Sequence, residues 1–122
     1  MSKEKAKGTA FERSVVEHLK SALGDGIERR CLQGANDCGD VSGVFFRGNP
    51  VVIECKNHRK MELAQWMDEA EREAGNADAH YWAVVHKRKG CGDASFGMTY
   101  VTMTLDVFES FLAQGFDLKE KA

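Results

Sequence analysis

Several absences narrow the range of functions before any motif is considered. No apolar run in the 122 residues approaches the roughly 20 residues that a membrane-spanning helix needs, so no membrane partner is expected. The basic segment Met1 to Lys7 is followed by no apolar stretch of the kind found in secretory signals, which favours a cytoplasmic protein. Repeats and low-complexity stretches are also missing, and there is only one proline. We therefore expect one globular domain over residues 1–122.

The four cysteines form no C-x-x-C pair, and their spacings match no common zinc-binding pattern. Without an export signal, reduced thiols are the expected state of these side chains. A zinc site built from Cys31, Cys38, His58 and Cys91 is the alternative that the sequence leaves open.

An excess of positive charge is missing as well, because the formal net charge is −2. A basic total would be the usual mark of a protein that binds nucleic acid, so the distribution of charge matters more than its sum. The acidic residues concentrate in residues 62–73 and around the candidate site. The basic residues gather in four short segments: residues 3–7, Arg29 and Arg30, Arg59 and Lys60, and residues 87–89. Each basic segment is either a patch for a phosphate backbone or ordinary solvated surface.

Hydrophobic periodicity predicts an α/β fold in which helices flank a mixed sheet, with the element order α-β-β-β-α-β and a C-terminal strand–helix appendix at residues 98–115. The expected helices cover residues 10–23, 60–75 and 105–113, and the expected strands cover residues 27–32, 40–46, 51–56, 80–85 and 98–103. Thr9 and Glu12 fit a capping box at the start of the first helix, and Thr104 fits a cap of the last one. The short turn before Pro50 predicts an antiparallel hairpin, and the helical crossover predicts a parallel fourth strand.

The most informative segment is the third predicted strand, which ends Val51-Val52-Ile53-Glu54-Cys55-Lys56. Because side chains alternate between the two faces of a strand, Glu54 and Lys56 point the same way. Asp40, near the start of the preceding strand, can reach the same place. Two carboxylates suit a divalent cation that holds a phosphate and a water, and a nearby lysine can orient that water. The segment therefore indicates a metal-dependent nuclease, whereas the plainer alternative is an exposed charge pair between Glu54 and Lys56.

Other polar and aromatic residues have two interpretations each. Glu12 borders the apolar stripe of the first helix, so it either belongs to the capping box or faces the sheet as a third acid, and these roles do not exclude each other. Asp37 competes with Asp40, although it fits a turn residue better. Trp66 and Trp82 would stack on bases or, as the plainer alternative, pack in the core.

These segments resemble the PD-(D/E)xK nuclease superfamily and, within it, the archaeal-type Holliday junction resolvases and related phage endonucleases. The resemblance covers residues 7 to about 90 and rests on Lys7-Gly8-Thr9-Ala10-Phe11-Glu12-Arg13, Gly39-Asp40-Val41, Ile53-Glu54-Cys55-Lys56 and the strand Tyr81 to Val85. The Lys-Gly-x-x-x-Glu-Arg opening is more specific than the acids alone. The chain departs from the pattern at Gly39, which stands where the superfamily carries its proline.

The resemblance implies a restriction-endonuclease-like core and a catalytic set made of Glu12, Asp40, Glu54 and Lys56. Asp40, Glu54 and the backbone carbonyl of Cys55 would bind Mg²⁺ or Mn²⁺, and Glu12 would complete the site directly or through water. Lys56 would act on the attacking water. The resemblance and the basic segments together predict the following DNA contacts: Lys7, Arg13, Arg29, Arg30, Arg59, Lys87 and Arg88.

By this resemblance we expect a metal-dependent DNA endonuclease that resolves four-way junctions for a phage or another mobile element. Resolution needs two symmetric cuts, so a homodimer is implied. Two alternatives stay open from the sequence. One is a sequence-specific or nicking endonuclease of the same fold, and the other is a non-catalytic module that binds nucleic acid.

Overall fold

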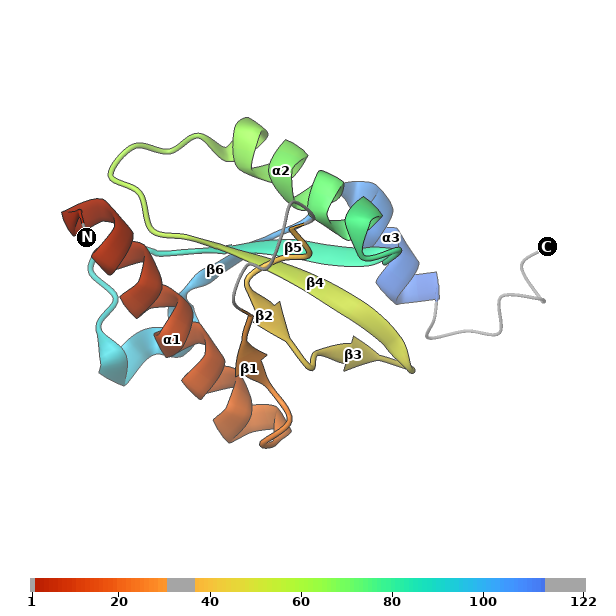
Figure 1. Cartoon of the computed structure of the whole chain (residues 1–122), viewed down its shortest axis with the longest axis horizontal. Helices are drawn as coiled ribbons and strands as arrows, with labels where there is room; N and C mark the ends of the chain where they lie inside the picture. The colour runs from red at the N-terminus through yellow and green to blue at the C-terminus, as the bar shows by residue number, and fades with distance from the viewer. Residues whose placement is uncertain (1, 31–36, 114–122) are drawn as a thin grey trace.

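The computed structural model describes residues 2–30 and 37–113 and shows helices on both sides of a mixed sheet (Figure 1). The elements are α1 (Lys3–Leu23), β1 (Glu28–Arg29), β2 (Val41–Ser42), β3 (Phe45–Phe46), β4 (Asn49–Lys56), α2 (Leu63–Asn76), β5 (Tyr81–His86), the 3₁₀ helix η1 (Asp93–Met98), β6 (Tyr100–Thr102) and α3 (Leu105–Ala113). The predicted fold class is confirmed, and the element order follows the prediction except that one predicted strand forms two short strands, β2 and β3. Within the described residues, no helix is long and apolar enough to cross a membrane.

The longest strand, β4, lies in the middle of the sheet and organises its neighbours. The strand order is β1-β2-β4-β5-β6, and β3 also pairs with β4. β4 runs antiparallel to β2 and β3, which confirms the predicted hairpin. β4 is parallel to β5, with Glu54 opposite Val84, which confirms the crossover through α2. β6 then adds antiparallel to β5.

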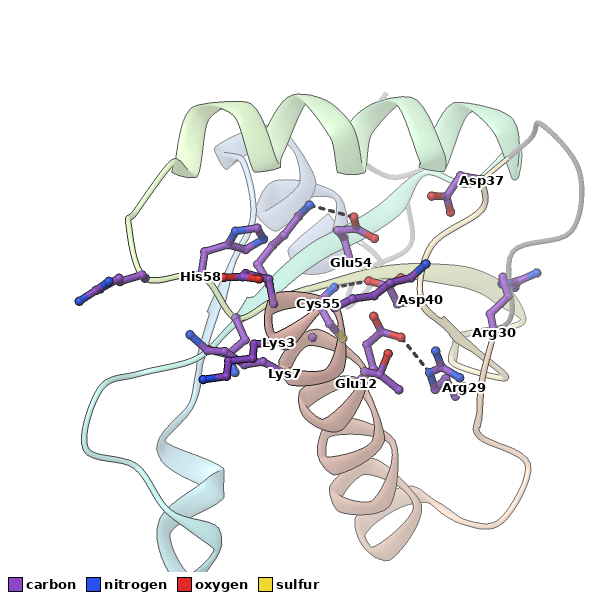
Figure 2. A pocket seen from close by; sticks show the side chains of 17 residues that line it. Lys3, Lys7, Glu12, Arg29, Arg30, Asp37, Asp40, Glu54, Cys55 and His58 are labelled. Carbon is purple, nitrogen blue, oxygen red and sulfur yellow. Dashed lines mark hydrogen bonds and ion pairs between the residues drawn. The ribbon is translucent and has the colours of Figure 1, made fainter. Parts of the chain in front are cut away.

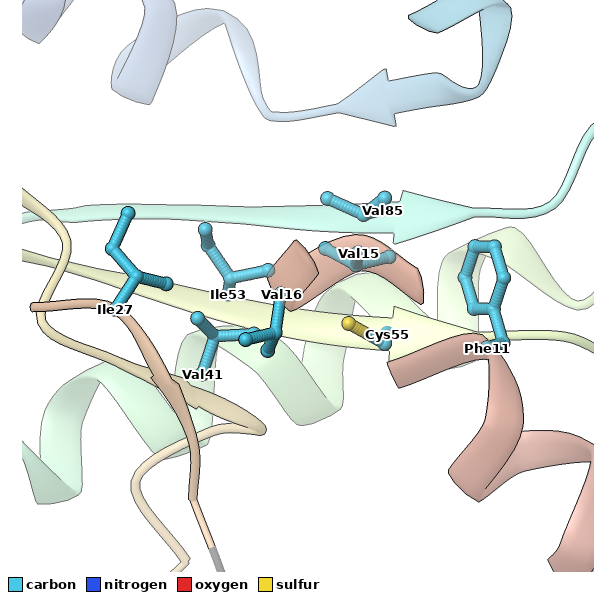
Figure 3. Close-up of a cluster of buried hydrophobic side chains, with 8 residues drawn as sticks. All are labelled: Phe11, Val15, Val16, Ile27, Val41, Ile53, Cys55 and Val85. Carbon is cyan, nitrogen blue, oxygen red and sulfur yellow. The ribbon is translucent and has the colours of Figure 1, made fainter. Parts of the chain in front are cut away.

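Side chains of β4 alternate between two hydrophobic clusters, one on each face of the sheet. The cluster under α1 contains Phe11, Val15, Val16, Ile27, Val41, Ile53, Cys55 and Val85 (Figure 3). The cluster under α2 contains Val52, Trp66, Ala70, Ala74, Trp82, Val84 and Val107. Both tryptophans are therefore core residues, as the plainer interpretation predicts. Because odd positions of β4 face α1 and even positions face α2, the end of this strand presents Glu54 and Lys56 on the α2 side.

The first helix begins at Lys3, well before the predicted start after Thr9. Its N-cap is Ser2, whose side-chain oxygen accepts a hydrogen bond from the backbone N–H of Lys5 at 3.1 Å. Thr9 lies inside the helix, so the predicted capping box of Thr9 and Glu12 is wrong. The reason is that an earlier cap followed by good helix-forming residues lets the helix extend, and Gly8 does not stop it. Glu12 is therefore not needed for capping.

The predicted strand over residues 40–46 is split into β2 and β3 at Gly43. Gly43 has a φ of +86°, and a side chain there would collide with the backbone carbonyl of Gly26. This close approach bends the chain between the two short strands. The predicted strand over residues 27–32 is reduced to Glu28–Arg29 in the described part, and residues 31 and 32 lie outside it. At the other end of the chain, Thr104 Oγ1 accepts from the N–H of Val107 at 3.2 Å, which confirms the predicted cap of α3.

Replacing Gly43 by alanine is expected to cost about 2–4 kcal/mol of unfolding free energy, because left-handed backbone strain adds to a collision with fixed backbone atoms. Gly48→Ala is the matched control, since Gly48 has a similar φ of +81° but open space around it. The control should lose only about 1–2 kcal/mol. Urea denaturation of both variants measures the difference, and equal losses would contradict the role assigned to the close approach.

Candidate active site

An open cleft of about 790 Å³ lies where β4 ends, bordered by the first turns of α1 and by β1 (Figure 2). The residues that line it include all four predicted catalytic residues: Glu12, Asp40, Glu54 and Lys56. The structure therefore brings together side chains that lie more than 40 positions apart in the sequence.

Asp40 is fixed to β4 by two hydrogen bonds. Its backbone N–H donates to the carbonyl of Ile53 at 2.8 Å, and its Oδ2 accepts from the backbone N–H of Cys55 at 2.7 Å. The preceding Gly39 has a φ of +98°, and Val52 and Ile53 leave no room for a side chain there. Proline cannot adopt that φ, so the backbone route into Asp40 explains why glycine stands where the superfamily carries proline.

Glu54 points from β4 toward α2 and is only 6% exposed. Its Oε2 lies 3.4 Å from Nζ of Lys56, which donates a shorter hydrogen bond of 2.6 Å to Oε2 of Glu69 on α2. The other oxygen of Glu54, Oε1, is buried and has no hydrogen-bond partner among the described residues. The plainer interpretation of an exposed charge pair therefore does not fit Glu54 and Lys56.

The two central carboxyl groups are difficult to ionise together. Burial raises the pKa of Asp40 from 3.8 to about 8, and the facing carboxyl group of Glu54 adds to this rise. Burial likewise raises the pKa of Glu54 from 4.5 to about 8, and Glu73 adds to it, although Asp40 and Lys56 act in the opposite direction. A multivalent cation would compensate this charge. Two carboxylates, one of them with a buried unpartnered oxygen, form an oxygen donor set that fits Mg²⁺ or Mn²⁺.

The other two predicted ligands lie beside this pair. Glu12 enters the cleft from α1, and its Oε1 accepts from Nε of Arg29 at 2.9 Å. Its negative charge contributes to the raised pKa of Asp40. Cys55 places its side chain in the cluster under α1, while its backbone N–H holds Asp40. Whether its carbonyl takes part in cation binding stays a prediction.

Two acids on α2 were not singled out from the sequence. Glu69 holds Lys56, and Glu73 is 3% exposed with a buried Oε1 that has no hydrogen-bond partner among the described residues. Burial raises the pKa of Glu73 from 4.5 to about 7. The position of Glu73 in the sequence could have indicated its burial. It lies between Ala70 and Ala74 on the apolar stripe of the helix, where a carboxyl group is unusual.

Basic side chains surround the acidic floor of the cleft. The predicted DNA-binding residues that line it are Lys7, Arg29, Arg30 and Arg59, and they are joined by Lys3 and Lys5. Three other predicted contacts lie outside this lining. Arg13 borders a separate depression with Asp93, the N–H of Lys87 donates to the Lys56 carbonyl, and Arg88 stacks over Tyr100 at 5.3 Å. Whether Arg13, Lys87 and Arg88 contact DNA outside the cleft stays a prediction.

The remaining alternatives concern a turn and a zinc site. Oδ1 of Asp37 accepts from the N–H of Gly39 at 2.9 Å, which is the turn role that its sequence context favoured. Of the proposed zinc ligands, Cys31 lies outside the described residues. Among the residues that are described, Cys38, His58 and Cys91 do not meet as a metal-binding group.

A family model described as "Phage putative PDDEXK endonuclease" matches residues 3–118 of the chain. The match spans α1 to α3, so it includes the whole cleft and also the C-terminal part that the sequence resemblance did not cover. The chain matches no curated protein and no solved structure.

In the absence of divalent cations, Glu54→Gln is expected to stabilise the protein at about pH 8 by roughly 1 kcal/mol or more. The pKa of Glu54 is raised in the folded state, so its contribution to stability is fully present below its ordinary pKa of 4.5 and is lost as the pH rises through about 8. The advantage of the variant should therefore disappear near pH 5. Thermal denaturation of the variant and of the unmodified protein in EDTA, at about pH 8 and at about pH 5, measures this difference in stability.

Glu71→Gln is the matched control for this comparison, because Glu71 is an exposed acid on α2. The unfolding free energy of this control should stay within about 0.5 kcal/mol of that of the unmodified protein at either pH. A lower melting temperature for Glu54→Gln than for the unmodified protein at about pH 8 would show that the Glu54 carboxylate is well compensated without a cation.

Proposed function

Because the chain belongs to the family of phage PDDEXK endonucleases, we propose that it hydrolyses phosphodiester bonds of DNA with the help of a divalent cation. The observation that carries this proposal is a pair of facing carboxyl groups, the half-buried one of Asp40 and the buried one of Glu54, which meet where β4 ends. Asp40 and Glu54 have pKa values raised to about 8, and the Lys56 ammonium lies beside them in an open cleft with a basic rim.

Asp40 and Glu54 would hold Mg²⁺ or Mn²⁺, with the carbonyl of Cys55 and, directly or through water, Glu12 as further ligands. The buried, unpartnered Oε1 of Glu54 supports this assignment, because a buried carboxylate oxygen without a partner is costly. A bound cation of this kind neutralises charge on a phosphate oxygen and makes a coordinated water more acidic.

Lys56 would serve as a hydrogen-bond donor in the cleft. Burial lowers its pKa, but the carboxylates of Glu69 and Glu54 outweigh burial and raise the pKa above its ordinary value of 10.5. The amine therefore remains protonated at neutral pH and cannot accept a proton as a general base. Its role is to orient the attacking water or to stabilise the negative charge that develops on the phosphate.

The basic rim would bind the phosphate backbone on both sides of the scissile bond. Lys7 approaches from α1, Arg29 and Arg30 from β1 and the segment after it, and Arg59 from the loop after β4. Arg29 is oriented by its ion pair with Glu12. Glu12 thus has a function in positioning a DNA contact as well as in completing the cation site.

The preferred substrate would be a four-way DNA junction, cut symmetrically by a homodimer. The Lys7 to Arg13 opening supports this choice through its resemblance to the junction resolvases. Leu105, Phe108 and Leu112 support a second copy, because they lie on one side of α3 and are 75%, 49% and 53% exposed. Exposed apolar stripes of this kind are typical of association surfaces.

Asp40→Asn and Glu54→Gln are each expected to lower DNA cleavage by more than about a hundredfold, because each removes a charged ligand of the cation. Both variants should still bind DNA in EDTA, since they remove negative charge from the cleft. Nicking of plasmid DNA measures cleavage and a gel-shift assay measures binding.

The matched control is Asp37→Asn, which makes the same chemical change in the same cleft at a turn residue. It should keep cleavage within a few-fold, because asparagine supports the same turn. Undiminished cleavage by Asp40→Asn or Glu54→Gln would refute the assigned site.

The substrate preference is tested with a synthetic four-way junction, its linear duplex arms and single-stranded DNA, each incubated with Mg²⁺ or with EDTA. We expect Mg²⁺-dependent cuts at symmetric positions of the junction and much slower cleavage of the other substrates. Equal cleavage of linear duplex would favour the sequence-specific or nicking alternative. Binding to DNA without any cleavage would favour the non-catalytic one.

A further inference from the structure

Exposed apolar side chains concentrate in the C-terminal part of the fold, away from the cleft. Among the described residues, nine large hydrophobic side chains are exposed, and six of them lie between residues 98 and 112: Met98, Tyr100, Val101, Leu105, Phe108 and Leu112. They belong to the end of η1, to β6 and to α3, and the lining of the cleft includes none of them. This concentration indicates an association surface that is separate from the cleft.

β6 is an edge strand whose outer side is open. It pairs with β5 on one side, and no other strand in the described part of the chain pairs with its second side. Alternate residues of a strand direct their N–H and C=O groups to opposite sides, so part of the β6 backbone points away from β5. Edge strands are commonly protected by charged residues or proline, whereas β6 consists of Tyr100, Val101 and Thr102, which all favour strands.

The partner that fits this edge best is a second copy of the chain. A strand that pairs antiparallel with its own copy creates a two-fold axis, which is the usual symmetry of a homodimer. Pairing about the central residue sets Val101 opposite Val101 of the second copy, and Tyr100 opposite Thr102. Cross-strand pairs of β-branched and aromatic side chains are favourable. Three residues alone are too few to hold two proteins together, so the surface beside β6 has to contribute.

The charges at the two ends of β6 are complementary to each other. The beginning of β6 lies beside a basic segment, because Tyr100 is opposite His86 and the guanidinium of Arg88 lies 5.3 Å from the centroid of the Tyr100 ring. The end of β6 leads into α3, whose exposed acids include Asp106 and Glu109. Antiparallel pairing brings the basic end of one copy to the acidic end of the other, and it does so twice. An unrelated protein would have to supply both charges itself, which favours a second copy.

We propose that two copies of the chain associate through β6, which pairs antiparallel with itself about Val101 and joins the two sheets into one. Arg88 of each copy faces Asp106 of the other, and the exposed Leu105 and Phe108 of α3 extend the apolar contact. This inference rests on the proposed function, because it assigns the interface of the homodimer that symmetric cleavage requires.

This interface fixes the relation between the two clefts. Cys55, Val85 and Val101 lie opposite one another in adjacent strands, so the two-fold axis is level with Cys55, between Glu54 and Lys56. Five strand spacings separate β4 from its copy, which amounts to about 24 Å at about 4.8 Å per spacing. The two β4 strands run in opposite directions on either side of the axis. Both sites are therefore held at one fixed separation, as two symmetric cuts require.

The test is sedimentation equilibrium of the full-length protein without DNA. The unmodified protein should be a dimer at micromolar concentration. Val101→Lys and Val101→Glu each set two like charges opposite each other at the axis, so each should raise the dissociation constant at least about a hundredfold. An equimolar mixture of these two variants should restore the dimer, because lysine then faces glutamate. Phe45→Lys is the matched control, since Phe45 is also an exposed strand residue, and it should remain a dimer.

A monomeric unmodified protein, or a dimer that survives Val101→Lys, would overturn the inference. A mixture of the two charged variants that stays monomeric would overturn the pairing about Val101. Should the charged variants fail to fold, as judged by circular dichroism, Val101→Cys replaces them. A short bismaleimide should then link two chains of this variant more readily than two chains of Phe45→Cys or of the unmodified protein, and equal linking would overturn the inference.

The outcome is distinguishable from that of the proposed function. A dimer that passes these tests but does not cleave DNA would support the β6 interface and contradict the nuclease activity. Cleavage of DNA by a protein that remains monomeric would support the nuclease activity and contradict the interface.

Discussion

The geometry of the cleft depends on the hydrogen bonds that attach Asp40 to β4. Through its backbone N–H and its carboxylate, Asp40 is joined to Ile53 and to Cys55, the residues on either side of Glu54. These bonds bring two acids into contact although both ionise poorly where they lie, as their raised pKa values show. Holding these two carboxyl groups together without a cation lowers the stability of the fold. The two hydrophobic clusters on the faces of β4 supply stabilisation that offsets this cost.

One strand thus serves both the core and the site, because its side chains alternate. Ile53 and Cys55 pack under α1, whereas Val52 packs under α2. Continuing the same alternation past Val52 places Glu54 and Lys56 against α2, beyond the edge of its apolar cluster. The acids of α2 therefore face the end of the strand without any special loop. A helix that covers the sheet for packing therefore also places Glu69 and Glu73 close to Glu54.

The sequence predicted those features that depend on local patterns. The Glu54-Cys55-Lys56 ending, the position of Asp40 and the pairing of β4 with its neighbours all follow from strand alternation and turn chemistry. The start of α1 was missed because Thr9 is a good cap in isolation, and only the cooperative extension of the helix from Ser2 removes it from that role. The break at Gly43 was missed because it arises from contact with Gly26, a distant partner that a local pattern does not reveal. Glu73 was missed because it meets Glu54 of β4 only when α2 packs on the sheet, and no local pattern in the sequence reveals that contact.

The negative net charge of the chain does not by itself argue against DNA binding, because the position of the acids in the cleft matters more than their number. A formal charge of −2 argues against binding to DNA only if every acid is left uncompensated. Here the acids that would repel a phosphate are gathered on the floor of the cleft, where the proposed cation would bind, and lysines and arginines lie on its rim. A divalent cation held by Asp40 and Glu54, as proposed, would offset the formal charge of −2 and would act at the point where the phosphate must approach. On the proposed function, cation binding would make an acidic protein locally attractive to DNA, so that the affinity of the cleft for DNA and its catalytic capacity would depend on the same carboxylates.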